Sequence, residues 1–287
     1  MIRMRSWIAL SVLLCLTQVS SARALVVAQP PGPQKFAGMQ TIAVGRVAAL
    51  EDQDVEIGDG DNKQTWRIAV VQVSEGIKGA KAKQQIRVGF MIPQQPRPGV
   101  PQLSSGPYRG PQFQVGQEGL FMLQQHPQAK FQYAPIFYHF VSSQQPNFKK
   151  DVEDAKVSVH ILQQPKEALS KGTAQEKLQA ASLIVTSFRS PTGPNPKQEP
   201  VDAETSKLIL KALRDADWNQ QPGRFNQTHP MNVLFQLGLT EKDGFRPGGD
   251  TPAQTHQAAQ QWLDANMNTY RIQRFVSQPP SGVLEEK

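Results

Sequence analysis

The sequence predicts an α+β fold in which a β-domain comes first and a helical domain follows. Up to about residue 142, short apolar segments alternate with turn clusters, the pattern typical of short strands. From about residue 147 onward, apolar residues recur at helical spacing, and the segments begin at capping residues. The length of 287 residues suggests about two domains.

The N-terminus has the three parts of a cleavable secretory signal peptide. Arg3 and Arg5 give a positive start, an apolar run follows over residues 7–16, and small residues precede a cleavage site after Ala24. Polar residues end the apolar run well short of the about 20 residues that span a bilayer. We therefore expect cleavage after Ala24, with Ala28 as the alternative, and a secreted or periplasmic protein.

Cysteine content and charge narrow the classes of function. The single cysteine, Cys15, lies within the signal, so the mature chain has no disulfide, zinc thiolate or cysteine nucleophile. Without the three arginines of the signal, 28 basic residues remain against 24 acidic ones, a net charge of +4. The basic residues are scattered among acids, so we expect no nucleic-acid partner. No later segment is apolar enough to predict a transmembrane helix.

Short strands are predicted in chain order over residues 42–47, 55–57, 66–73, 86–90, 119–123 and 133–138. In the third segment, Trp66, Ile68 and Val70 share one face. Gly76 and Gly79 are expected to bracket the turn that follows it. Strands of this number and length favour a small barrel or a sandwich.

A proline-rich stretch interrupts the strands over residues 93–116. It is too rich in proline to be a paired strand and too long for an ordinary hairpin loop. Prolines hold a chain extended at low entropic cost, and Arg97, Tyr108 and Arg109 are residue types that make good interface anchors. These three residues are the candidate binding site; a loosely packed insertion is the alternative.

The helical half has clear start signals. Thr173 with Glu176 predicts a capping box, Asp202 is expected to cap the next helix, and Thr251 followed by Pro252 marks the last one. A first helix stops before a proline at position 165, residues 191–200 form a loop, and a short helix over residues 231–237 ends at a glycine. The expected buried stripes of the four longer helices are Val152, Ala155, Val159 and Leu162; Leu178, Ala181, Val185 and Phe188; Leu208, Ile209, Ala212, Leu213 and Ala216; and Ala258, Trp262 and Ala265.

The β-domain resembles a known family in the order of its segments, which are residues 44–47, 73–79, 86–88 and 115–121. This order is similar to the OB-type barrel of netrin-like and metalloprotease-inhibitor (TIMP-like) domains, over about a third of the chain. Those inhibitors use an N-terminal cysteine and several disulfides, which the mature chain lacks, so the resemblance implies the fold and not the inhibition. The whole chain also resembles secreted bacterial proteins without an assigned activity that join such a β-domain to a helical C-terminal region.

The predicted fold is thus an N-terminal OB-like β-barrel followed by a C-terminal all-α domain, either a small bundle or a HEAT-like stack of helix pairs. The expected parts are a signal peptide (1–24), a linker (25–40), an OB-like β-domain (41–145) with its proline-rich insertion (93–116), a helical domain (146–277) and a disordered tail (278–287).

No catalytic or metal-binding motif is evident in the sequence, and we expect no cofactor. The histidines do not fall at ligand spacing, although two of them could still meet in the fold; they are His126, His139, His160, His229 and His256. An acidic turn could gather around Ca²⁺ but lacks the order of an EF-hand, so a solvated hairpin tip is favoured; its acids are Glu51, Asp52, Asp54, Asp59 and Asp61. Trp218, Trp262 and Tyr270 are expected to pack between helices.

These observations favour a non-enzymatic exported interaction protein whose partner is a protein or a component of the cell envelope. Its contact surface would be the proline-rich loop or a groove between helices. The alternative is an exported hydrolase or carbohydrate-active enzyme whose active site is dispersed along the sequence.

Overall fold

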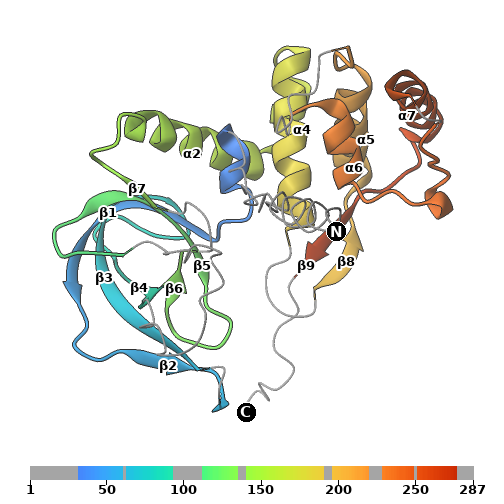
Figure 1. Cartoon of the computed structure of the whole chain (residues 1–287). Helices are drawn as coiled ribbons and strands as arrows, with labels where there is room; N and C mark the ends of the chain where they lie inside the picture. Colours follow the sequence, from blue (N-terminus) through green and yellow to red (C-terminus); the bar gives the residue numbers. More distant parts are fainter. Residues whose placement is uncertain are drawn as a thin grey trace, which may run out of the picture. The chain divides into compact units, whose positions relative to one another are not determined.

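The computed structural model describes residues 32–60, 63–92, 112–134, 140–190, 196–219, 228–248 and 251–276. Within these residues the chain is a mixed α+β protein, with a seven-stranded sheet first and helices after it (Figure 1). All of the described residues belong to one compact unit that spans residues 29–96 and 109–287. The predicted signal peptide and the predicted tail lie outside the described residues.

The strands of the large sheet are β1 (Thr41–Leu50), β2 (Val55–Ile57), β3 (Gln64–Lys78), β4 (Gln85–Met91), β5 (Glu118–Gln125), β6 (Gln132–Tyr133) and β7 (Phe140–Ser142). Strand β3 pairs antiparallel with β1, with β2 and with β4. Strand β4 pairs in parallel with β6, and β5 pairs antiparallel with β6, β7 and β1. Strand β1 therefore has partners on both of its edges.

Strand β1 changes register against β3 at three places, one of them between Val44 and Gly45. A Cβ atom on Gly45 would lie 2.8 Å from the backbone oxygen of Gln72 and 2.9 Å from Cγ1 of Val71. Only glycine allows the two strands to approach this closely. Register shifts of this kind increase the local twist of a strand pair.

Both faces of β3 are buried, because apolar residues follow one another without alternation in its centre. Trp66 and Ile68 pack on one face in a cluster with Phe131, as their predicted common face requires. Ala69 and Val71 point to the opposite face and belong to a larger cluster formed by β1, β4 and β5. Strands with near-continuous apolar runs are typical of sheets that are covered on both sides.

The remaining elements are η1 (Gly32–Phe36), α2 (Phe148–Gln163), α3 (Pro165–Ser170), α4 (Ala174–Arg189), β8 (Lys197–Pro200), α5 (Ala203–Arg214), α6 (Pro230–Gln236), η3 (Glu241–Asp243), α7 (Pro252–Asn266) and β9 (Gln273–Val276). The predicted helix starts are confirmed: Thr173 and Thr251 form capping boxes, and Asp202 accepts a hydrogen bond from the backbone N–H of Thr205. Gly238, predicted to end α6, has a φ of 70°.

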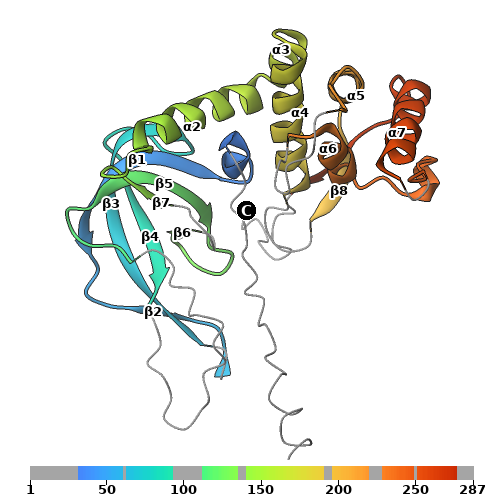
Figure 2. The ribbon, with the colours of Figure 1, turned by 45° about the horizontal axis from the view of Figure 1, so that its top comes forward.

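Helix α2 lies against the large sheet (Figures 1 and 2). Three of its four predicted stripe residues, Val152, Ala155 and Val159, are buried in a cluster with Ile42 and Leu120 of the strands. The fourth, Leu162, is only partly buried and packs against the helical core. Phe36 of η1 is fully buried in the same cluster. The segment from residue 32 to 40 is therefore folded, where the sequence predicted a linker.

A second core joins α3, α4, α5, α6 and α7. The sequence predicted an all-α C-terminal region. This prediction is wrong, because β8 and β9 pair as a two-stranded antiparallel sheet. Strand β8 occupies residues 197–200, which were expected to be a loop. Its partner lies more than 70 positions away in the chain, and such long-range pairing leaves no local pattern.

Several predicted elements differ in detail. Strand β3 runs through Gly76, so the turn begins only at Gly79, whose φ is 66°. The strand expected over residues 133–138 is short: β6 ends at Tyr133, residues 135–139 lie outside the described residues, and β7 follows. Helix α3 begins at Pro165, in the first turn of a helix, where proline is favoured. From the sequence, this proline was expected only to end the preceding helix.

Two packing predictions are corrected. In α7, Trp262 is buried as expected, but its buried neighbours are Ala259 and Leu263 rather than Ala258 and Ala265. The proline-rich insertion is packed at its C-terminal end, because Phe113 is only 3% exposed. The ring of Phe113 contacts three other phenylalanines of the β-core, Phe90, Phe121 and Phe140.

Candidate functional site

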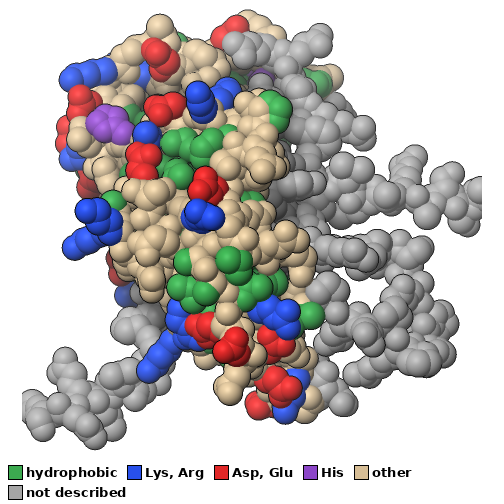
Figure 3. All heavy atoms as spheres, turned by 90° about the vertical axis from the view of Figure 1, so that its left-hand side faces the viewer, with side chains coloured by type: hydrophobic (Ala, Val, Ile, Leu, Met, Phe, Trp, Pro, Cys, Tyr) green, Lys and Arg blue, Asp and Glu red, His purple; other side chains and the backbone are tan. Residues whose placement is uncertain are grey.

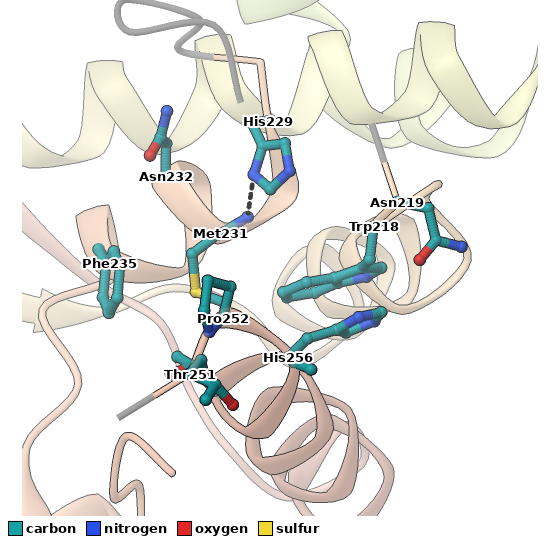
Figure 4. Close-up of a pocket in the computed structure, with 11 residues that line it drawn as sticks. Trp218, Asn219, His229, Met231, Asn232, Phe235, Thr251, Pro252 and His256 are labelled. Carbon is teal, nitrogen blue, oxygen red and sulfur yellow. Dashed lines mark hydrogen bonds between the residues drawn. The ribbon is translucent and has the colours of Figure 1, made fainter. Parts of the chain in front are cut away.

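The binding residues predicted from the sequence, Arg97, Tyr108 and Arg109, lie outside the described residues, and so does the predicted cleavage site at Ala24. The described part of the chain contains a different concave site. A pocket of about 590 Å³ lies between the N-terminal ends of α6 and α7 and the segment that follows α5 (Figure 4). We call this pocket the α6–α7 groove; its lining residues are Trp218, Asn219, His229, Met231, Asn232, Phe235, Thr251, Pro252, Ala253, Thr255 and His256.

Local capping holds the two helix ends that form the groove. His229 is the N-cap of α6, and its Nδ1 accepts a hydrogen bond of 3.2 Å from the backbone N–H of Met231. At α7, the hydroxyl of Thr251 accepts from the backbone N–H of Gln254, whose side chain accepts in turn from the Thr251 N–H. The helix ends are thereby fixed before any ligand binds.

An aromatic pair forms one wall of the groove. The rings of Trp218 and His256 stack with centroids 4.8 Å apart and planes inclined by only 7° (Figure 4). Trp218 also donates a hydrogen bond of 2.8 Å from its indole N–H to the backbone oxygen of Leu213. Trp218 is only 8% exposed. Because the stacked imidazole and the hydrogen bond both hold its indole ring, the ring presents a rigid surface to the groove.

The rest of the lining combines apolar side chains with uncharged polar ones, among them the amides of Asn219 and Asn232. Phe235 lies at the groove with 54% of its surface exposed, which is high for a large apolar side chain. Met231 adds a flexible apolar side chain to the lining, and Pro252 adds a rigid one (Figure 4). Among the described lining residues there is no carboxylate, lysine or arginine. The groove is therefore suited to an uncharged ligand group whose surface is largely apolar.

The fold brings two of the histidines to one site, an outcome that the sequence left open. His229 and His256 line the same groove, although they are separated by α6 and the start of α7. His126 lies elsewhere, in an aromatic cluster with Trp66, Phe131 and Tyr133, and burial lowers the pKa of its imidazole. His139 lies outside the described residues.

The acidic turn is held by arginines of neighbouring strands. Glu51 accepts two hydrogen bonds from the guanidinium of Arg87, at 2.6 and 2.7 Å. These bonds keep the pKa of Glu51 below its usual value. Asp54 pairs in the same way with Arg67, at 3.0 and 3.3 Å. In the described part of the chain, no group of three or more histidine, cysteine or acidic side chains is placed to hold a metal ion.

The surface has no dominant charge on the face shown in Figure 3, where basic and acidic side chains are interspersed. Several charged side chains of the described residues form exposed pairs, such as Lys63 with Glu56 and Arg46 with Glu118. Exposed pairs of this kind contribute little to stability. Among the described helices, none is both long and apolar enough to cross a membrane.

Comparisons with known proteins give no family, relative or structural neighbour for this chain: no protein-family model, no curated protein and no solved structure matches it. The groove therefore has to be interpreted from its own residues. The sequence identified both helices that form it but assigned Trp218 only to packing. The exposed Phe235 was a usable signal, since it falls off the buried face of a short apolar helix.

Proposed function

We propose that this chain is a non-enzymatic, exported binding protein whose α6–α7 groove holds two or three apolar side chains of a protein partner. The observation that carries the proposal is the groove itself, a preformed neutral pocket with a rigid aromatic wall and an exposed phenylalanine. Its volume of about 590 Å³ falls within the range of about 300–1,000 Å³ that is common for ligand sites.

The size and chemistry favour side chains of a protein over a polar small molecule. At about 30 Å³ for each water-sized group, the groove has room for about twenty such groups, which corresponds to a few large side chains. Partly exposed aromatic residues are enriched at protein interfaces, where they supply contact area at low entropic cost. The groove also agrees with one of the two contact surfaces expected from the sequence.

Export is part of this proposal. It rests on the positive start, the apolar run and the small residues of the first 24 positions. The exported chain should start at Leu25, or at Gln29 after the alternative cut, and intact-mass measurement distinguishes the two. A retained Met1 would contradict export through this signal.

We further infer that the large sheet is an OB-like barrel, the fold implied by the resemblance to netrin-like domains. The pairing of β5 with β6 and with β1 supports this inference, since it joins β1, β3, β4, β6 and β5 into a closed ring in which each strand pairs with the next. The parallel pairing of β4 with β6 is the crossover that a Greek-key barrel of five strands contains.

The proposed function is tested by capture with a matched pair of surface variants. Phe235→Glu places a charge at the groove, whereas Val157→Glu places one on α2, at a residue that is also exposed (52%) and does not line the groove. We expect the mature wild type and Val157→Glu to capture the same stoichiometric partner from the extracytoplasmic fraction. Phe235→Glu should lose it, because a carboxylate cannot be buried unpaired in an apolar contact.

An enzyme remains the second candidate because His229 and His256 share the groove. If the site is hydrolytic, wild type should turn over a panel of ester, amide or glycoside substrates, and His256→Ala should abolish that turnover while the chain stays folded. Turnover that depends on His256, with no partner captured, would replace the binding proposal.

A further inference from the structure

A second pocket, separate from the α6–α7 groove, lies beside the last residue of β3. It has a volume of about 240 Å³, and Lys78 lines it together with residues of α2, the start of α3 and α4. Lys78 comes directly before Gly79, whose Cβ position would lie 2.3 Å from the backbone oxygen of Gln40. This close approach fixes the end of the strand and therefore the place of the lysine.

Among the described residues, the charge of Lys78 is not balanced by a neighbour. Two other lysines are paired with acids of the sheet and of α2: Lys156 binds Glu75 at 3.0 Å, and Lys35 binds Asp151. For the ammonium group of Lys78, by contrast, no hydrogen bond or ion pair is found with any described residue. Burial lowers the pKa of its ammonium group, which is the direction expected when a cation loses water without gaining a partner.

The walls around this lysine are apolar. Ile184 and Val159 are 1% and 5% exposed, and Leu162 and Phe188 complete the apolar lining. Such a wall excludes water from one side of the ammonium group and increases the strength of any ion pair made there. The lining also includes the polar side chains of Gln163 and Ser187.

From this arrangement we propose that the Lys78 pocket binds a small monocarboxylate with an apolar tail, whose carboxylate pairs with Lys78 and whose tail fills the space between α2 and α4. At about 30 Å³ for each water-sized group, 240 Å³ holds about eight non-hydrogen groups. A chain of about six carbons with its carboxylate has this size. The proposal is independent of the proposed function, because the α6–α7 groove is neutral and shares no lining residue with this pocket.

The test uses hexanoate as the probe and the purified mature chain. The amide NMR signals of Gln163 and Ser187 should shift saturably, with a dissociation constant in the millimolar range that is usual for ligands of this size. The uncharged analogue 1-hexanol should bind at least about tenfold more weakly, because it fills the pocket without pairing with the lysine.

Variants of the protein distinguish binding at this pocket from nonspecific binding of hexanoate. Lys78→Met should weaken hexanoate binding at least about tenfold, Lys78→Arg should retain it, and Lys171→Met should leave it unchanged. Lys171 is the matched control because its side chain is 77% exposed and lies outside the pocket. Lys78→Met should unfold at the same temperature as wild type or higher, since it removes a half-buried charge without a partner.

A further variant, Leu162→Trp, fills the pocket while leaving the lysine in place, and it should also abolish binding. The proposal is overturned by any of three results: no saturable shift up to about 20 mM hexanoate, equal affinity for hexanoate and 1-hexanol, or equal affinity of wild type and Lys78→Met. Loss of the protein partner in the groove experiment would leave this result unaffected, so the two proposals fail separately.

Discussion

At the scale of single residues, Trp262 and Tyr270 show how the helical core restricts a titratable group. The two rings meet edge to face with centroids 5.1 Å apart, and the indole N–H of Trp262 donates to the backbone oxygen of Asp243 at 2.8 Å. Burial, and after it the nearby charge of Asp243, raise the pKa of the Tyr270 phenol to about 12. The neutral phenol is therefore the form that the fold favours.

This raised pKa leads to a prediction for Tyr270→Phe. The phenol stabilises the fold while it stays protonated, and this contribution is lost as the pH rises from the unfolded-state pKa near 10 through the folded pKa near 12. The difference between the wild-type and variant absorbance titrations at 295 nm should have its midpoint near pH 12. A midpoint near pH 10 would show that the side chain is solvated.

The residues of the groove illustrate what single positions reveal in a sequence. His229 and His256 could be named from the sequence as candidate ligands. That they line one groove depends on how α6 and α7 pack and not on the spacing of the two residues in the chain. Trp218 was expected to pack between helices, and it does so while also lining the groove. A side chain with both roles has the same local pattern as one that is only buried.

At the scale of elements, the start of α5 is defined by one side chain. The carboxylate of Asp202 accepts from the backbone N–H of Thr205 at 3.0 Å, and this hydrogen bond is the main reason that its pKa lies below the usual value. Lys166 of α3 lies 3.4 Å away and adds a weaker, exposed ion pair.

Asp202→Ala should lower the free energy of unfolding by about 1 kcal/mol, the usual cost of losing an N-cap. Asp202→Asn is the control, because an amide oxygen can accept the same bond. The cap bond to the ionised carboxylate stabilises the fold above the unfolded-state pKa of about 4 and is lost as the pH falls through the lower folded value. Urea unfolding should thus show the difference between wild type and Asp202→Ala shrinking below about pH 4. A constant difference down to pH 2 would contradict this account.

Helix starts could be predicted from the sequence because capping is local. The side-chain capping bonds of Thr173, Asp202 and Thr251 each reach the residue three positions further along, so each signal is complete within four residues. Strand β8 and the buried face of α7 could not be predicted, because each depends on a distant partner. Leu263 is buried where α7 packs against the rest of the helical core, and no spacing rule within α7 fixes that direction.

At the scale of the whole described unit, α2 and η1 connect the strands to the helices. Gln34 of η1 donates to the hydroxyl of Ser182 of α4 at 3.4 Å, while Phe36 of the same turn is buried with Ile42 and Leu120. The boundary predicted between residues 145 and 146 would separate α2 from the strands that it covers. The sequence could not show this, since an amphipathic stripe identifies a buried face but not what covers it.

This connection predicts that one substitution in α2 destabilises strands and helices together. Ala155 is fully buried against the sheet, whereas Val157, two residues further along α2, is 52% exposed. Ala155→Asp buries an unpaired carboxylate and should cost at least about 3 kcal/mol, which lowers the melting temperature by roughly 6–12 °C in a domain of this size. Val157→Asp should change it by no more than about 2 °C. Far-ultraviolet circular dichroism should follow the helices. Tryptophan fluorescence should follow the sheet through Trp66 when Trp218 and Trp262 are replaced by phenylalanine in every protein compared, and both signals should shift together in Ala155→Asp. If only the sheet signal shifts while the helical transition keeps its wild-type midpoint, then the strands and helices unfold as separate units, and α2 does not couple them.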